Sequence, residues 1–126
     1  MKKLLLLLAA LSLIGAGCIP SAQDRELTKK LKCQEVGEKY QQASLDGVRG
    51  SNIVIDSHEI AYSKKLNTCL YFAQWSVLNT PHKVVIVDLL TNKVLAEAFG
   101  SDVNKAGSLG EPYKDFYNKK NEWFSE

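Results

Sequence analysis

Long hydrophobic runs, clustered cysteines and catalytic motifs are what this sequence of 126 residues lacks. Its longest apolar stretch is too short for a membrane-spanning helix, which needs about 20 residues. No C-x-x-C pair is present, so the spacing typical of a zinc site is missing. G-x-S-x-G, Walker and dinucleotide-binding sequences are absent as well. These absences predict no metal, no cofactor and no enzymatic activity.

Acidic residues are missing from the start of the chain, where none precedes Asp24. The net charge of +2 includes Lys2 and Lys3, so removal of these two residues would leave a charge of zero. A neutral domain has no overall basic field to attract nucleic acid. The sequence therefore predicts no nucleic-acid partner, and it predicts no polybasic face for anionic lipid.

Three short segments open the chain. Met1 to Lys3 is positive, Leu4 to Ile14 is apolar apart from Ser12, and Gly15 to Cys18 supplies small residues. This order is typical of a secretory signal peptide. We expect residues 1–17 to be a leader that is cleaved off.

With Cys18 at its end, the leader resembles the signal of bacterial lipoproteins. The resemblance implies cleavage before Cys18 and acylation of its thiol, which gives a multiple-chain membrane anchor. The family prefers leucine three residues before the cysteine, whereas this chain has Gly15, so ordinary secretion is the alternative. By the same resemblance Ile19 is no inner-membrane retention residue. The implied location is the cell envelope, and the periplasmic side of the outer membrane where the source has two membranes.

The mature chain is expected to begin with a tether and a helix. We expect residues 18–31 to form a lipid-anchored tether and residues 32–126 to form a single domain. Ser21 and Asp24 loosely match a capping box. Between Lys32 and Ser44, four apolar positions fall on one helical face and predict a helix that packs on the domain: Cys33, Val36, Tyr40 and Ala43.

Four β-prone runs follow, joined by short polar turns. They are Ile53–Tyr62, interrupted near Asp56–His58, then Thr68–Leu78, Lys83–Leu89 and Val94–Phe99. Short connections favour antiparallel pairing, so the sequence predicts an α+β fold with a meander of about four strands. An all-β half-barrel is the alternative. In the second run we assign one alternating face to the core: Cys69, Tyr71, Ala73, Trp75 and Val77.

The last part of the chain is predicted to form a loop followed by a short helix. Ser101–Gly110 is rich in glycine and small polar residues, and Glu111-Pro112 suits a helix start. The aromatic residues that follow are expected to cover the open face or edge of the sheet, the alternative being an exposed patch for a partner: Tyr113, Phe116, Tyr117, Trp123 and Phe124.

Two cysteines remain in the predicted mature domain. Cys33 lies on the apolar face of the expected helix, and Cys69 lies on the sheet face assigned to the core. Export would place both in an oxidising compartment, so we predict a disulfide that adds about 3–4 kcal/mol. Two buried free thiols, or a metal site with His58 or His82, are the alternatives.

Side chains suited to acid–base catalysis gather only around Asp56, His58 and Glu59. Alternation along a strand points neighbours to opposite faces, so we expect these three to be separated. Their convergence in a deep pocket would favour an enzyme.

The segment Tyr62-Ser63-Lys64-Lys65-Leu66-Asn67-Thr68-Cys69 and the strands after it resemble a set of small bacterial envelope proteins. The resemblance implies a shared fold and a shared cysteine, and it brings no activity. We therefore expect a non-enzymatic interaction or accessory lipoprotein, with a protein partner in addition to the membrane. The alternative is an inhibitor or immunity-type lipoprotein that blocks a lytic enzyme, bacteriocin or phage, with the loop from Gly100 to Glu111 as the inserting segment.

Overall fold

The computed structural model describes residues 20–77, 80–100 and 111–125. The fold is α+β, as the sequence predicts, with helices at both ends and one antiparallel four-stranded sheet in the order β1-β2-β3-β4. The leader, Cys18 and the expected loop Ser101–Gly110 lie outside the described residues. The elements are α2 (Ala22–Val48), β1 (Ile53–Ser63), β2 (Thr68–Val77), β3 (Thr80–Asp88), β4 (Lys93–Gly100) and α3 (Glu111–Phe124).

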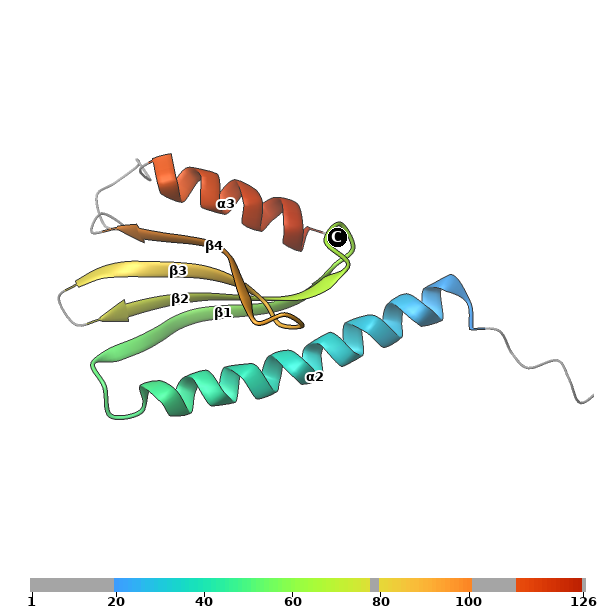
Figure 1. Ribbon diagram of the computed structural model, residues 1–126, viewed down its shortest axis with the longest axis horizontal. Coiled ribbons are helices and arrows are strands. Elements are labelled where there is room, and N and C mark those ends of the chain that lie inside the picture. The colour runs from blue at the N-terminus through green and yellow to red at the C-terminus, as the bar shows by residue number, and fades with distance from the viewer. Residues whose placement is uncertain (1–19, 78–79, 101–110, 126) are drawn as a thin grey trace, which may run out of the picture.

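The sheet lies between the two helices (Figure 1). α2 packs mainly on β1, and α3 packs mainly on β4 from the opposite face. One half of α2 lies under the sheet, and its first turns extend past the end of the sheet that carries the β1–β2 turn (Figure 1). The start of α2 therefore projects beyond the sheet at this end of the molecule.

α2 begins ten residues before the expected Lys32. Its start is a capping box, in which Ser21 Oγ accepts a hydrogen bond from the Asp24 backbone N–H at 3.1 Å. The Asp24 carboxylate in turn accepts from the Ser21 backbone N–H at 3.0 Å. This reciprocal capping satisfies two otherwise unpaired donors, which allows the helix to start there without help from the sheet. Only residues 18–21 of the expected tether precede the helix.

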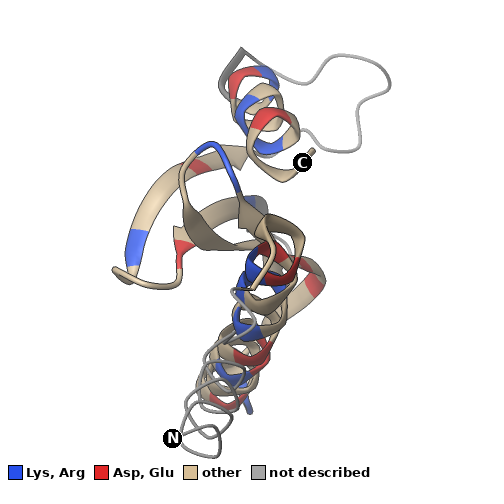
Figure 2. Cartoon of the chain, turned by 90° about the vertical axis from the view of Figure 1, so that its right-hand side faces the viewer, with Lys and Arg blue, Asp and Glu red and all other residues tan. Residues whose placement is uncertain are grey.

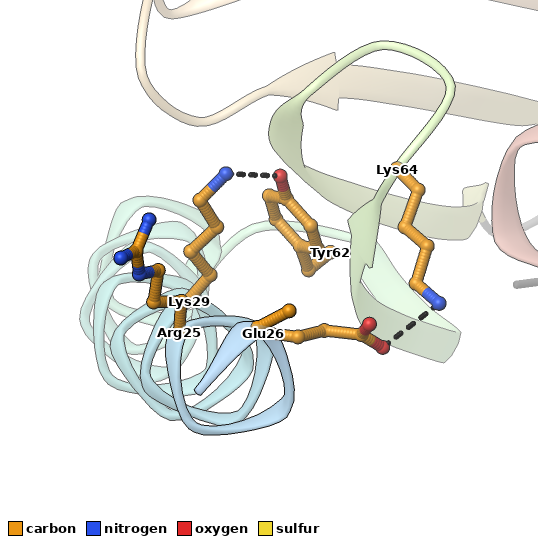
Figure 3. Close-up of a pocket in the computed structure, with 6 residues that line it drawn as sticks. Arg25, Glu26, Lys29, Tyr62 and Lys64 are labelled. Carbon is orange, nitrogen blue, oxygen red and sulfur yellow. Dashed lines mark hydrogen bonds and ion pairs between the residues drawn. The ribbon is translucent and has the colours of Figure 1, made fainter. Parts of the chain in front are cut away.

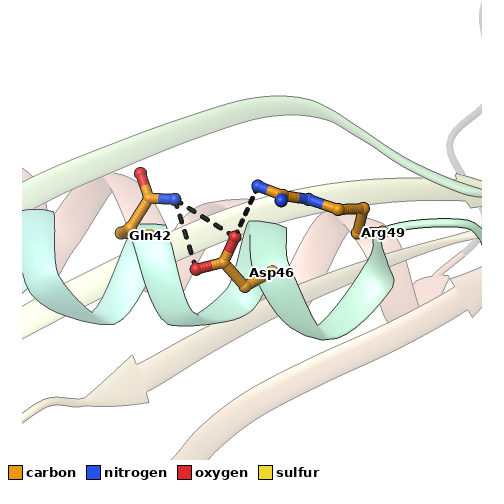
Figure 4. Close-up of polar contacts among 3 residues, drawn as sticks. All are labelled: Gln42, Asp46 and Arg49. Carbon is orange, nitrogen blue, oxygen red and sulfur yellow. Dashed lines mark hydrogen bonds and ion pairs between the residues drawn. The ribbon is translucent and has the colours of Figure 1, made fainter.

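The end of α2 is held by three polar side chains (Figure 4). The Gln42 side-chain amide donates to both carboxylate oxygens of Asp46 at 3.3 Å, and the Arg49 guanidinium binds the same carboxylate at 2.8 Å. The Arg49 backbone N–H also donates to the Asp46 carbonyl at 3.3 Å. These bonds carry the helix two residues past Asp46, to Val48, before Gly50 turns the chain with φ of 79°.

The first strand is one element with a local irregularity. β1 runs from Ile53 to Ser63, and its register against β2 shifts between Ile55 and Ser57. The expected interruption near Asp56–His58 is therefore a β-bulge, which changes the local twist without ending the strand.

β2 is buried on both faces from Thr68 to Ala73, which corrects the assignment of the core to a single face of this strand. Leu70 and Phe72, on the face assigned away from the core, are 0% and 6% exposed. They pack against α3, because its aromatic rings cover this second face as expected. The α3-side core consists of Leu70, Phe72, Val84, Ile86, Ala98, Tyr113 and Phe116. The α2-side core consists of Tyr71, Ala73, Val85 and Val87, flanked by Tyr40, Ile55, Ile60, Trp75 and Leu89.

Candidate functional site

An open groove of about 400 Å³ lies between the first turns of α2 and the end of β1 (Figure 3). Its walls carry three cationic side chains, one carboxylate and one phenol: Arg25, Lys29, Lys64, Glu26 and Tyr62. Ala22 completes the lining. Because the capping box starts α2 so early, the helix reaches far enough to form one wall. We refer to this site as the helix–turn groove.

Lys29 joins α2 to the β1–β2 turn. Its ammonium group donates to Tyr62 Oη and to Asn67 Oδ1, each at 3.0 Å. The Tyr62 hydroxyl also donates to Asn67 Oδ1 at 2.6 Å, and the Lys29 ammonium lies 5.3 Å from the centre of the Tyr62 ring. Both oxygen atoms that Lys29 binds are neutral, so this cluster fixes the lysine without neutralising its charge.

The β1–β2 turn owes its shape to its own polar residues. The Asn67 backbone has φ of 50°, a left-handed conformation that asparagine tolerates well, and its N–H donates to the Lys64 carbonyl at 3.2 Å. The fully buried Ser63 accepts the Leu66 backbone N–H on its Oγ at 3.4 Å. The turn therefore presents Lys64 at its exposed start in a fixed position beside the groove.

Two cations share one carboxylate at the groove. Lys30 and Lys64 both bind Glu26 Oε1 at 2.9 Å. These hydrogen bonds hold the pKa of Glu26 below its usual range, so the carboxylate stays ionised. A single carboxylate thus binds two ammonium groups, and cationic side chains outnumber carboxylates in the described lining of the groove.

Thr68 and Asp88 link β2 to the β3–β4 turn. Thr68 Oγ1 donates to Asp88 Oδ1 at 2.6 Å, and the same oxygen accepts the Leu90 backbone N–H at 2.9 Å. Burial raises the pKa of Asp88, but the hydrogen bonds from Thr68, Leu90 and Thr91 outweigh it and leave the pKa below its usual range. This carboxylate acts as a structural acceptor.

The structure brings the two predicted disulfide partners together as free thiols. Cys33 and Cys69 are 1% and 5% exposed, and their side chains lie close enough to influence each other. The Cys33 thiol donates to the Ala61 carbonyl at 3.2 Å. Burial raises the pKa of Cys33 to about 12, and Cys69 adds to the effect, so a thiolate is disfavoured. The adjacency fits a disulfide, which stays a prediction.

Two smaller grooves flank α2 next to these cysteines. One of about 250 Å³ is lined in part by Cys33 and Ile60, and another of about 270 Å³ is lined in part by Cys69 and Leu90. Tyr62 lines both of them and the helix–turn groove as well. The residues of the Tyr62–Cys69 segment thus shape this end of the molecule.

The three residues considered for acid–base catalysis do not converge. Asp56 accepts a hydrogen bond from Ser76 Oγ at 2.9 Å. His58 lies on the α2 side, with Nδ1 3.4 Å from the Gln41 amide, whereas Glu59 binds Lys120 of α3 at 2.5 Å. All three are exposed, and His58 and Glu59 point to opposite faces of β1, as alternation predicts.

Sequence reasoning missed the Lys29–Tyr62–Asn67 cluster, because it treated residues 18–31 as a tether. A usable signal was present. Lys29 lies four residues before Cys33 and therefore continues the helical face of Cys33, Val36 and Tyr40 by one more turn. Because lysine counts as a polar residue, the apolar pattern did not place Lys29 on the face of the helix that packs on the sheet.

No group of three or more metal-ligating side chains occurs among the described residues, and the side chain of His82 lies outside them. Within the same part of the chain, no helix is long and apolar enough to cross a membrane. The chain matches no protein-family model, no curated protein and no solved structure.

Proposed function

We propose that this protein is a lipoprotein of the bacterial cell envelope, anchored through an acylated Cys18. Its domain serves as a non-enzymatic interaction or accessory module at the membrane surface. The order of the leader carries the proposal: a positive start, an apolar run, small residues and then Cys18. Where the envelope has two membranes, the proposed site is the periplasmic side of the outer membrane.

The start of the fold supports this arrangement. The helix cap Ser21 comes three residues after Cys18. At about 3.3–3.6 Å per residue, the anchor would hold the start of α2 within roughly 10 Å of the acylated cysteine. The dispersal of Asp56, His58 and Glu59 supports a role without catalysis.

The test is the intact mass of protein extracted from membranes with detergent. We expect the mass of residues 18–126 increased by a diacylglyceryl group and a further acyl chain. The Cys18→Ala variant should lose the acyl mass and leave the membrane fraction. Cys33→Ala is the matched control, because it removes a different cysteine and should keep both properties. An unmodified amino terminus in the native protein would refute the anchor.

A further inference from the structure

Among the described residues that line it, the helix–turn groove carries more cationic than acidic side chains. Arg25, Lys29 and Lys64 line the groove with Glu26 as its one carboxylate, which gives three positive charges against one. Glu26 also binds Lys30 from outside the lining. The zero total charge of the predicted mature chain is therefore unevenly distributed.

Two of these cations have no acidic partner among the described residues. Lys29 binds the neutral oxygens of Tyr62 and Asn67. Arg25 donates through Nε to the Pro20 carbonyl at 3.2 Å, and no carboxylate lies within ion-pair distance of its guanidinium in the part of the chain that is described. Both side chains are exposed, so their charges are available to an anion from outside.

The groove lies where the chain leads to Cys18. Pro20, whose carbonyl Arg25 contacts, is two residues from Cys18, a reach of about 7 Å. Lys64 comes from the β1–β2 turn, so a second element contributes charge at the same end. Figure 2, which views the molecule from this end, shows basic residues on both α2 and the β1–β2 turn.

We propose that the helix–turn groove binds the phosphates of anionic phospholipid headgroups, and that this contact lays the start of α2 on the bilayer beside the anchor. The inference rests on the proposed function, because the acyl anchor brings the groove to the lipid. Arginine offers a planar fork of donors to phosphate, and lysine offers a compact ammonium group. The sum of charges in the sequence could not reveal this surface, since it averages the groove with the acidic remainder of the chain.

The test uses native lipoprotein reconstituted into two kinds of vesicle. One is phosphatidylcholine alone, and the other contains phosphatidylglycerol as well. A water-soluble amine-acylating reagent is applied, and the modification of each lysine is read from peptide masses. We expect the reactivity of Lys29 and Lys64 to fall about fivefold in the anionic vesicles, the change that corresponds to one basic contact at such a surface. Lys39 and Lys114, which are exposed elsewhere, serve as internal controls and should not change.

A matched pair of arginine variants sharpens the result. Arg25→Gln should remove much of the protection of Lys29, whereas Arg49→Gln, at the other end of the same helix, should leave it intact. Added salt should restore reactivity in the anionic vesicles, because it screens exposed charges.

The outcomes separate the two proposals. Protein that enters neither kind of vesicle contradicts the anchor and so the proposed function. Protein that enters both with equal lysine reactivity overturns the headgroup site alone. An equal loss of reactivity on adding inorganic phosphate to neutral vesicles, at constant ionic strength, would show a site for free anions and would also overturn it.

Discussion

α3 meets the sheet with buried aromatic rings, whereas the fully buried residues of α2 on the opposite face are small and only the half-buried Tyr40 adds a ring there. Tyr113 and Phe116 are 6% and 2% exposed, and the Phe116 ring lies 6.1 Å from that of Phe72. The buried residues of α2 are Cys33 and Gly37. α3 thus buries apolar area against the sheet. α2 instead approaches the sheet so closely that larger side chains would not fit at its buried positions.

The α2 side also carries the unpaired polar atoms. Tyr71 Oη and Trp75 Nε1 are buried with no hydrogen-bond partner among the described residues. Burial raises the pKa of Tyr71, with a further contribution from Tyr40. One sheet can therefore pack an aromatic, apolar core on one face and a tighter core with unpaired polar atoms on the other.

The largest expected effect tests the aromatic side. Phe116→Ala should lower the free energy of unfolding by about 3–5 kcal/mol, because it leaves a cavity between α3 and the sheet. Lys114→Ala, an exposed change in the same helix, should stay within about 0.5 kcal/mol of the parent. Urea unfolding followed by circular dichroism measures both. Equal effects of the two changes would contradict the assigned packing of α3.

The next effect concerns the thiols on the α2 side. A bridge between Cys33 and Cys69 should stabilise the exported protein by about 3–4 kcal/mol, as the chain-entropy account gives for a loop of this length. Reductant should then lower the unfolding midpoint of the parent and leave a Cys33→Ala/Cys69→Ala variant unchanged. Thiol titration of denatured, unreduced protein decides the point, and two reactive thiols would exclude the bridge.

A pair of glycine changes tests the close approach of α2. A Cβ atom added at Gly37 would lie 2.4 Å from Ile60 Cγ2, whereas one added at Gly47 meets nothing within 4 Å. Both Gly→Ala changes gain helix propensity, and Gly37 in the helix interior gains at least as much as Gly47 in the last turn, so a lower stability of Gly37→Ala reports the clash. We expect Gly37→Ala to be about 1–3 kcal/mol less stable than Gly47→Ala in thermal unfolding. Equal stability would show that the Ile60 side chain or the helix can move aside without cost.

A smaller effect is expected at Asp88, whose carboxylate accepts hydrogen bonds from β2 and from the β3–β4 turn. Its pKa is lowered in the folded state, so its contribution is present above the unfolded pKa and is lost as pH falls through the folded pKa. Asp88→Asn should cost about 1–2 kcal/mol at neutral pH. The cost should shrink below about pH 4, as unfolding at a series of pH values would reveal. A cost that does not vary with pH would refute this role of the charge.

The smallest effect tests the polar character of the α2 side. Tyr71→Phe removes a buried hydroxyl that has no partner in the described residues, so stability should rise by about 1 kcal/mol. Phe72→Tyr, the reverse change on the α3 side, should lower it. A loss of stability in Tyr71→Phe would show that the hydroxyl has a partner in solution.

The sequence was a good guide where one local signal was enough. Alternating β-branched and aromatic residues predicted the strands, and Pro112 marked the first turn of α3. Residues that serve two elements at once were harder to interpret. Lys29 falls within the expected tether in the sequence, and only the fold places it beside Tyr62 and Asn67, 33 and 38 residues later. Leu70 was assigned away from the core because alternation cannot show that a second layer covers the other face.

Neighbours in sequence are also the main neighbours in space throughout the described chain: α2 with β1, each strand with the next, and β4 with α3. Few distant segments must therefore meet before native pairing begins, which keeps the entropy of loop closure small. Refolding of the domain should accordingly proceed on the order of milliseconds, faster than in a sandwich with crossed connections.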